Sequence, residues 1–320
     1  MLSAAAAFAA TLLLGTTVSA QTLERVNEYV EFSSVNITDG SFDVSLVPSS
    51  KYSVKIVVDA LLSDYVTSSV RDKAVYIGYD SKSVPKEVKK LYAGRKKPDP
   101  VLQVVIYAPT LQELYLADGS QFSSTGDFTA ERFNVTLVDN AKVNSLNMRA
   151  ENVGILLKKK ASAVMNLEVP GCLTVSTEGS SNVRVTGTMG AVATTSAGSS
   201  TILVEGKSEE LDIHSEGSSQ VTVNTETRKA RIESANSSRV VLSGSATELE
   251  VAGKNSASVD VRNVKVDEVR LGVHSATVNV GEKKSLILDL AGGAAVYYEG
   301  TPQFTVEKII KSTLAPAGTK

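Results

Sequence analysis

Two glutamates in this 320-residue chain have the spacing of a paired-carboxylate catalytic site. Glu178 and Glu216 each precede a Gly-Ser-Ser turn, two repeats apart, with Ala197 at the equivalent place between them. If the repeats stack as neighbouring strands, the two backbones lie ~9.6 Å apart, and an inverting glycosidase needs ~6.5–9.5 Å between its carboxyl groups. The chain has no tryptophan, and neither an aromatic row nor clustered arginines accompany the pair, so we interpret it as surface charge.

The other reactive side chains are isolated from one another. His214 and His274 are the only histidines, and about three repeats separate them, or ~14 Å along a stack of strands. They cannot share a metal ion, whose ligand atoms must lie within ~2.1 Å of it. Cys172 is the single cysteine and has no histidine on its repeat, which indicates an inert, partly buried thiol. We therefore expect no catalytic residue, no cofactor and no metal site, and the binding residues stay unassigned.

A serine recurs at a fixed interval through the second half of the chain. Five successive intervals of 19 residues separate the marker serines, which are Ser180, Ser199, Ser218, Ser237, Ser256 and Ser275. A row of hydroxyls could bind a polysaccharide or ordered water. Small residues are also needed wherever a chain turns tightly, and hydroxyls there bond to neighbouring backbone. We favour the turn interpretation.

The same period determines the elements that must position these residues. An alternating apolar pair follows each turn, as at Val183/Val185, and a second apolar strand precedes it, as at Leu211/Ile213. Such self-similarity is typical of a solenoid, and crossovers between parallel strands are right-handed. We predict an all-β fold, a right-handed parallel β-helix with rungs of about 19–21 residues, preceded by an N-terminal β region with one short helix.

Outward positions of the first strand in each repeat offer a test of this stacking. Asp212, Arg231, Glu250 and Arg270 alternate in sign on successive rungs. Opposite charges on adjacent strands stabilise a sheet by ~0.2–1 kcal/mol per pair. The alternation supports stacking in register and carries no information about catalysis.

The region before the repeats has a different pattern. Period-two alternation over 30–77 predicts strands, and Asp39-Gly40 within it predicts a hairpin. Residues 83–92 are predicted to form a helix, because apolar residues share one face and a proline lies near its start. We interpret the basic stretches 94–100 and 158–160 as a solvated loop and a turn that keeps a sheet edge soluble.

Bulk composition and the first residues indicate an exported protein. An apolar run over 5–14 and the small residues Val18-Ser19-Ala20 are typical of a secretory signal peptide, and the run is shorter than the ~20 residues of a spanning helix. The net charge of −2 gives no electrostatic case for nucleic acid or an anionic membrane. Aromatic residues at 5% argue against a sugar groove built on aromatic platforms. The predicted parts are a signal peptide (1–20), an N-terminal β region (21–108), β-helix repeats (109–302) and a C-terminal tail (303–320).

Several β segments follow one another in an order that is similar to a known family. The segments are Phe42-Asp43-Val44-Ser45-Leu46, Tyr52-Ser53-Val54-Lys55-Ile56, Val75-Tyr76-Ile77-Gly78-Tyr79-Asp80, Val104-Val105-Ile106-Tyr107-Ala108-Pro109, Leu114-Tyr115-Leu116-Ala117-Asp118-Gly119-Ser120 and Val296-Tyr297-Tyr298-Glu299-Gly300-Thr301-Pro302. Over about residues 25–310 the chain resembles the "putative autotransporter adhesin, head GIN domain" family of exported proteins in Bacteroidetes-type bacteria. The resemblance implies a β-helical fold and an exported location, and it implies no demonstrated activity.

Three functions are consistent with these observations. The first is a non-enzymatic, adhesin-like or envelope binding module that presents flat sheet faces to a glycan or protein partner at the cell surface. The alternatives are a carbohydrate-active enzyme of the lyase or glycosidase type and a purely structural envelope protein. An enzyme gathers its acid, base and charge stabilisers on one patch, whereas this chain spreads its acidic residues over many rungs. We therefore favour the binding module, in the periplasm, at the outer-membrane surface or outside the cell, with no stable membrane insertion after signal cleavage.

Export predicts a defined N-terminus. Because Val18-Ser19-Ala20 has the small-x-small pattern of a cleavage site, the mature protein should begin at Gln21. N-terminal sequencing of secreted material checks this, and a membrane-bound form that retains the Ala-rich segment would contradict it.

Overall fold

The computed structural model describes residues 8–9, 21–94 and 97–318. The predicted signal peptide lies almost wholly outside the described residues, as does part of the basic loop at 94–100. The chain divides between Met148 and Arg149 into two compact units, here unit 1 and unit 2. The boundary expected after residue 108 falls inside unit 1, where the parallel coils have already begun.

Unit 1 combines parallel coils with an antiparallel insertion. Its elements are β1 (Phe8–Ala9), β2 (Thr22–Tyr29), β3 (Ser34–Thr38), β4 (Asp43–Pro48), β5 (Tyr52–Asp59), the 3-10 helix η1 (Ala60–Tyr65), β6 (Val66–Arg71), β7 (Ala74–Tyr79), α1 (Lys86–Tyr92), β8 (Leu102–Ala108), β9 (Glu113–Leu116) and β10 (Gln121–Leu137). In the coils, β3 runs parallel to β7 and β9, and β4 runs parallel to β8 and β10. The insertion adds β5 antiparallel to β2 and β8, and β6 antiparallel to β7. Fully buried phenylalanines such as Phe32, Phe42 and Phe122 fill the core.

The hairpin predicted around Asp39-Gly40 is wrong. The strands on either side of it, β3 and β4, pair in parallel with strands of other coils. Asp39, with φ of 54°, turns the chain at the corner of a coil. A local turn signal specifies a change of direction and leaves open which strand the next segment joins. The hairpin of this region is β6–β7, whose turn residues Asp72 and Lys73 have φ of 50° and 60°.

The predicted helix is confirmed with a later start. α1 (Lys86–Tyr92) begins at Lys86 instead of Ser83, and Pro85 is its N-cap. The delay has a local cause, because the Asp80 carboxylate accepts the backbone N–H groups of Lys82 and Ser83. This side-chain turn competes with helix formation ahead of the proline.

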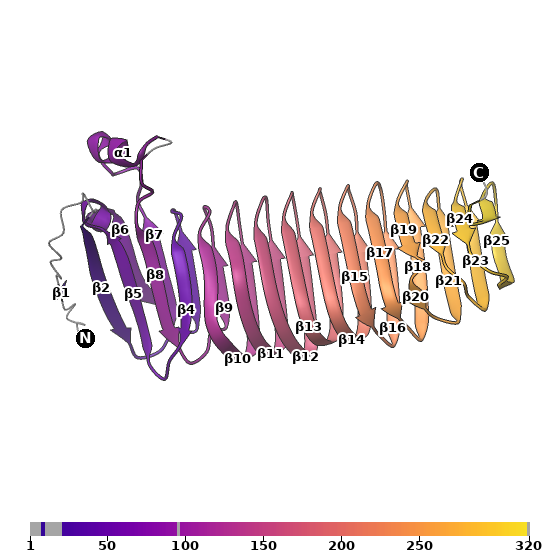
Figure 1. The fold of residues 1–320 in the computed structure, drawn as a ribbon, viewed down its shortest axis with the longest axis horizontal. Helices are drawn as coiled ribbons and strands as arrows, with labels where there is room; N and C mark the ends of the chain where they lie inside the picture. The colour runs from indigo at the N-terminus through magenta and orange to yellow at the C-terminus, as the bar shows by residue number, and fades with distance from the viewer. Residues whose placement is uncertain (1–7, 10–20, 95–96, 319–320) are drawn as a thin grey trace. The chain divides into compact units, whose positions relative to one another are not determined.

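Unit 2 is a continuous stack of parallel coils. Its strands, after β11 (Lys142–Leu157) at the junction, are β12 (Ser162–Thr177), β13 (Asn182–Ser196), β14 (Thr201–Ser215), β15 (Gln220–Glu226), β16 (Lys229–Ser234), β17 (Arg239–Ser245), β18 (Glu248–Lys254), β19 (Ser258–Val261), β20 (Val264–Lys265), β21 (Glu268–His274), β22 (Thr277–Val280), β23 (Ser285–Ala291), β24 (Ala295–Tyr298), β25 (Gln303–Ile309) and β26 (Thr313–Pro316). Figure 1 shows successive strands of this unit lying side by side. The described residues form a β-solenoid of about 11 turns, which confirms the predicted fold class.

The pairing register of unit 2 follows the 19-residue period. Val183 lies beside Ile202, Ile202 beside Val221, and Val221 beside Val240. This inward column is Val183, Ile202, Val221, Val240, Val259, Val278 and Val296, and every member is buried. Each coil therefore places its apolar residues directly against those of its neighbours, which is how a one-dimensional stack builds a core.

The charge alternation predicted for the outer face is confirmed. Asp212 lies beside Arg231, Arg231 beside Glu250, and Glu250 beside Arg270. The direct ion pair of Arg231 is with Glu233 on its own strand. The alternation thus contributes to the register through proximity of opposite charges, and not through a chain of salt bridges.

The segment 303–320 is predicted to be a tail, but its residues 303–316 form one more coil. β25 pairs in parallel with β23, and β26 pairs in parallel with β24. The period-two pattern of β25 is interrupted by a register shift opposite Leu288/Asp289, which hides the strand from sequence inspection.

A pair of substitutions tests the inside/outside register. Val223 is buried between Val204 and Leu242, so Val223→Asp should lower the free energy of unfolding by several kcal/mol, because it buries an unpaired charge. Asp212→Ser changes an exposed side chain and should cost under about 1 kcal/mol. Urea denaturation of both variants measures the difference, and the opposite ranking would contradict the register.

Candidate functional site

The two glutamates with catalytic spacing lie on the open surface. Both are exposed and follow equivalent strand ends two coils apart, as predicted. The Glu178 carboxylate is 3.5 Å from the Lys158 ammonium, in the basic turn at 158–160. The arrangement agrees with surface charge.

The two histidines and the cysteine lie on different coils. His214 Nδ1 is 3.3 Å from Glu233 Oε2, and His274 is exposed on another coil. Cys172 is half-buried, with Sγ 3.9 Å from the Thr174 hydroxyl. Within the described residues, no group of three or more His, Cys, Asp or Glu side chains could hold a metal ion.

The serine turns contain a buried hydroxyl network. The first four marker serines, such as Ser218, are exposed, whereas the serine that follows each of them is buried, as are Ser196, Ser215 and Ser234 at the end of the preceding strand. Ser219 Oγ donates to the Glu216 carbonyl (2.7 Å) and lies 2.9 Å from Ser215 Oγ and 3.1 Å from Ser196 Oγ. Because these hydroxyls bond to one another and to turn carbonyls, they hold the corner of the coil. The turn interpretation named the marker serines, and the hydroxyls that do the bonding lie one place later and at the end of the preceding strand.

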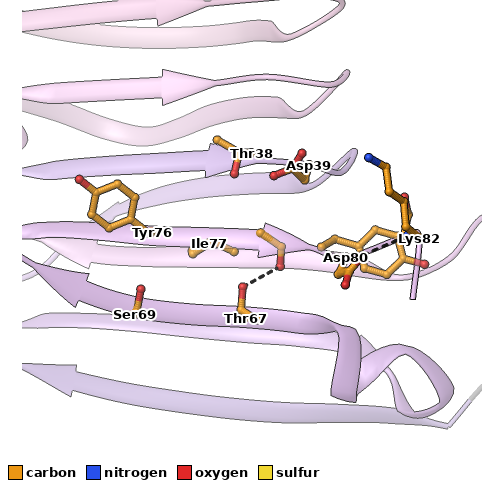
Figure 2. Close-up of a pocket in the computed structure, with 11 residues that line it drawn as sticks. Thr38, Asp39, Thr67, Ser69, Tyr76, Ile77, Asp80 and Lys82 are labelled. Carbon is orange, nitrogen blue, oxygen red and sulfur yellow. Dashed lines mark hydrogen bonds between the residues drawn. The ribbon is translucent and has the colours of Figure 1, made fainter. Parts of the chain in front are cut away.

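A hollow of about 340 Å³ lies on the surface of unit 1 where the insertion meets the first coil. Figure 2 shows Thr38 and Asp39 from β3 and its turn on one side, and Thr67 and Ser69 from β6 on the other. β7 runs between them, with Gly78 in register with Thr38 and with Thr67. A side chain at Gly78 would project between the two threonine hydroxyls, so its absence opens the hollow.

Two tyrosines, Tyr76 and Tyr79, border this space. Tyr76 is in register with Ser69 on one side and Asn36 on the other, and it is 45% exposed. Asn36 is in turn in register with Tyr115 of β9. Tyr76, Asn36 and Tyr115 thus form an outward column across three parallel strands, beginning at the hollow.

Charged groups at the other end of the hollow are held by local bonds. Asp80 accepts the Ser83 hydroxyl (2.5 Å) and the backbone N–H groups of Lys82 and Ser83. These bonds, the Ser83 hydroxyl foremost, lower the pKa of Asp80, so its carboxylate is ionised and oriented. Burial raises the pKa of the neighbouring Tyr79, so this phenol stays neutral and can donate a hydrogen bond. The hollow therefore offers hydroxyl donors and acceptors, the Asp39 carboxylate, the oriented Asp80 carboxylate, the Lys82 side chain and two tyrosine rings.

Sequence reasoning assigned no binding residue and missed this hollow. The aromatic content of 5% is an average over the chain, and all but two of the tyrosines precede residue 116. That uneven distribution was the available signal. The hollow itself depends on β6 pairing with β7 beside β3, a set of partners that local patterns do not specify.

Comparison with known proteins assigns the family. The family model "Putative auto-transporter adhesin, head GIN domain" matches residues 31–206 and 177–302. The chain belongs to this family. The resemblance inferred from the order of β segments is thereby confirmed. No curated protein matches the chain.

Three solved structures of similar proteins come from Parabacteroides species. A "putative adhesin" from Parabacteroides merdae is 16% identical with a TM-score of 0.42, over 92% of this chain and 96% of that one. A "putative adhesin" from Parabacteroides distasonis is 16% identical with a TM-score of 0.39, and a "Putative lipid binding protein" from the same species is 13% identical with a TM-score of 0.37. Both of these alignments also cover 92% of this chain and 96% of the other.

The serine network gives a test that separates the two kinds of turn serine. Ser219→Ala removes a fully buried hydroxyl and leaves partners unsatisfied, so the free energy of unfolding should fall by about 1–3 kcal/mol. Ser218→Ala, the matched control in the adjacent exposed position, should change it by less than about 0.5 kcal/mol. Equal effects in thermal or urea unfolding would contradict a structural role for the buried row.

Proposed function

We propose that this chain is an exported, non-enzymatic binding protein of the adhesin type, and that the hollow over Gly78 takes a neutral sugar unit of a glycan. The family assignment supports an adhesin-like protein. The lining of the hollow supports the ligand class, and it is the observation that carries the proposal.

The chemistry of the lining matches that of a sugar ring. A sugar has one face of C–H groups and a rim of hydroxyls that both donate and accept hydrogen bonds. The exposed ring of Tyr76 offers an apolar face that carries partial negative charge, and C–H groups can stack on it. Thr38, Thr67 and Ser69 offer hydroxyls that can replace the water around the sugar rim. Because these contacts replace good hydrogen bonds to water, one sugar unit alone should bind weakly.

The Asp80 carboxylate fits a binding role better than a catalytic one. A glycosidase needs a protonated general acid, which requires a raised pKa. The Ser83 hydroxyl and two backbone N–H groups lower the pKa of Asp80. An ionised carboxylate with a fixed orientation is a good acceptor for a sugar hydroxyl. This observation supports the non-enzymatic proposal over the glycosidase alternative.

The outward column of Tyr76, Asn36 and Tyr115 extends the proposal to a chain of sugars. These residues lie on successive parallel strands, so their backbones are ~4.8 Å apart. The two tyrosines are therefore ~9.6 Å apart, a span that suits two units of an extended glycan. The flat face of the first coils would then bind the units that follow the one in the hollow.

Binding should be lost when the hollow is filled. Gly78 has an ordinary φ and room for a Cβ, with its nearest contacts at 3.6 Å, so Gly78→Val should fold and should occupy the space between Thr38 and Thr67. On a glycan array followed by calorimetric titration of the best neutral glycan, we expect affinity to fall at least about tenfold, or ~1.4 kcal/mol. Tyr76→Ala should act in the same direction, and Tyr76→Phe should retain most binding because it keeps the ring.

The matched control is Gly272→Val. Gly272 lies on a strand of unit 2, also with an ordinary φ and with open space around a Cβ, so the same substitution there should leave glycan affinity unchanged. Glycan binding that survives Gly78→Val would place the site elsewhere on the sheet faces. Capture of a purified surface protein with no glycan binding at all would favour a protein partner, and glycan turnover lost in Asp80→Asn would favour the enzyme.

A further inference from the structure

A second hollow, of about 360 Å³, lies in unit 1 where β2 ends and β5 begins. Its lining includes Glu28, Tyr29, Ser50, Lys51, Tyr52 and Ser53. The hollow over Gly78 shares no residue with this one, so the two sites are separate. The volume is at the lower end of the ~300–1,000 Å³ that small-molecule sites enclose, which indicates a ligand of few atoms.

Two tyrosine rings in this lining are held by contact with a third aromatic residue. Tyr29 and Tyr52 lie opposite each other in the pairing of β2 with β5. Phe32, which is fully buried, contacts both rings edge to face, with its ring centroid 5.9 Å from that of Tyr29 and 5.1 Å from that of Tyr52. Both tyrosines are half-buried, so each keeps part of its surface for a ligand. The hollow therefore has a fixed aromatic surface.

An acidic and a basic side chain in the lining have no charged partner. Glu28 and Lys51 are both exposed, and neither forms an ion pair with any described residue. They are diagonal to each other across the two strands, since Glu28 lies opposite Ser53 and Lys51 comes two residues before Ser53. Long side chains in this relation can reach each other. Their separation therefore needs a local cause.

An equivalent pair on the same strands shows what that cause is. Glu24 and Lys55 have the same diagonal relation, and their charged groups are 2.7 Å apart. Lys55 lies within β5, whereas Lys51 precedes the strand in a turn, where its backbone N–H donates to the Ser49 hydroxyl (3.1 Å). The turn takes the Lys51 backbone out of the strand pairing, so its ammonium and the Glu28 carboxylate stay apart at the hollow.

We propose that this hollow binds a small zwitterion of the amino-acid type. The ligand's ammonium binds the Glu28 carboxylate, its carboxylate binds the Lys51 ammonium, and an apolar side group packs on the rings of Tyr29 and Tyr52. Charge-assisted hydrogen bonds at both ends orient the ligand, and an aromatic side group gains specific contact with the tyrosines. Because both protein charges are exposed, each contact is weak, and affinity depends on the three contacts together. This site is independent of the glycan proposal.

Ligands that lack one feature at a time test this assignment. L-phenylalanine should bind the purified chain with a dissociation constant of about 1 mM or below, in a titration followed by ligand-observed NMR. The compound 3-phenylpropionate lacks the ammonium, phenethylamine lacks the carboxylate, and glycine lacks the side group. Each should bind at least about threefold more weakly, because each loses one of the three contacts.

Substitutions at the open charge pair have matched controls on the same strands. Glu28→Gln and Lys51→Met should each raise the dissociation constant for L-phenylalanine at least about threefold. Glu24→Gln and Lys55→Met make the same changes at the closed pair, outside the lining, and should leave the constant unchanged. Gly78→Val should also leave it unchanged, because Gly78 lines the other hollow.

Absence of saturable L-phenylalanine binding up to about 10 mM would overturn the proposal. So would 3-phenylpropionate or phenethylamine that binds as tightly as L-phenylalanine, since charge would then play no part. Loss of binding in the control variants to the same degree would place the site elsewhere. Tighter binding of phosphoethanolamine, a zwitterion without a side group, would replace the amino-acid class with a lipid headgroup. Circular dichroism of each variant checks the fold, which changes at these surface side chains should not disturb.

Discussion

Backbone hydrogen bonding between parallel strands that lie one repeat apart in the sequence is the constraint on which the rest of this structure depends. From β13 to β17, each paired residue lies beside the residue that occupies the same place in the next coil. Side chains of the same kind are therefore stacked in columns. The polar or apolar groups of a column must find their contact partners within that column, because the nearest neighbours of each side chain belong to it. Apolar columns build the core, and hydroxyl columns build the corners.

The serine corner shows how a polar column can be buried at little cost. A buried hydroxyl without a partner is expensive, and a column of hydroxyls supplies partners above and below every member. Ser196, Ser215 and Ser219 meet this condition by bonding to one another across adjacent coils. Where the pattern changes, Ala257 and Ala276 take the buried place, which removes the need for a partner. The corner is thus either fully hydrogen-bonded or apolar.

The sequence predicted those features that repeat, and it did not predict those that occur once. The inward valines and the sign alternation of Asp212 and Arg231 follow from the period alone, so both could be foreseen. The hairpin at Asp39-Gly40 could not be judged, because a turn residue specifies a bend and not a pairing partner. The hollow over Gly78 arises from one insertion that brings β6 beside β7, and no second copy of that arrangement exists in the repeats to reveal it. The coil formed by β25 was missed because its register shift breaks the alternation by which strands are recognised.

The constant 19-residue repeat of the coils from β13 to β18 also affects how the gene can change. Each coil contacts only its two neighbours. If one whole repeat in the middle of unit 2 were lost or duplicated, every residue of the adjoining coils would still lie beside an equivalent residue. Loss of a single residue within a strand would instead turn the following side chains to the opposite face. Unequal recombination between repeats can therefore lengthen or shorten the molecule in whole coils. The number of coils, and with it the length of unit 2, is then a property that selection can adjust without redesigning either the core or the candidate site in unit 1.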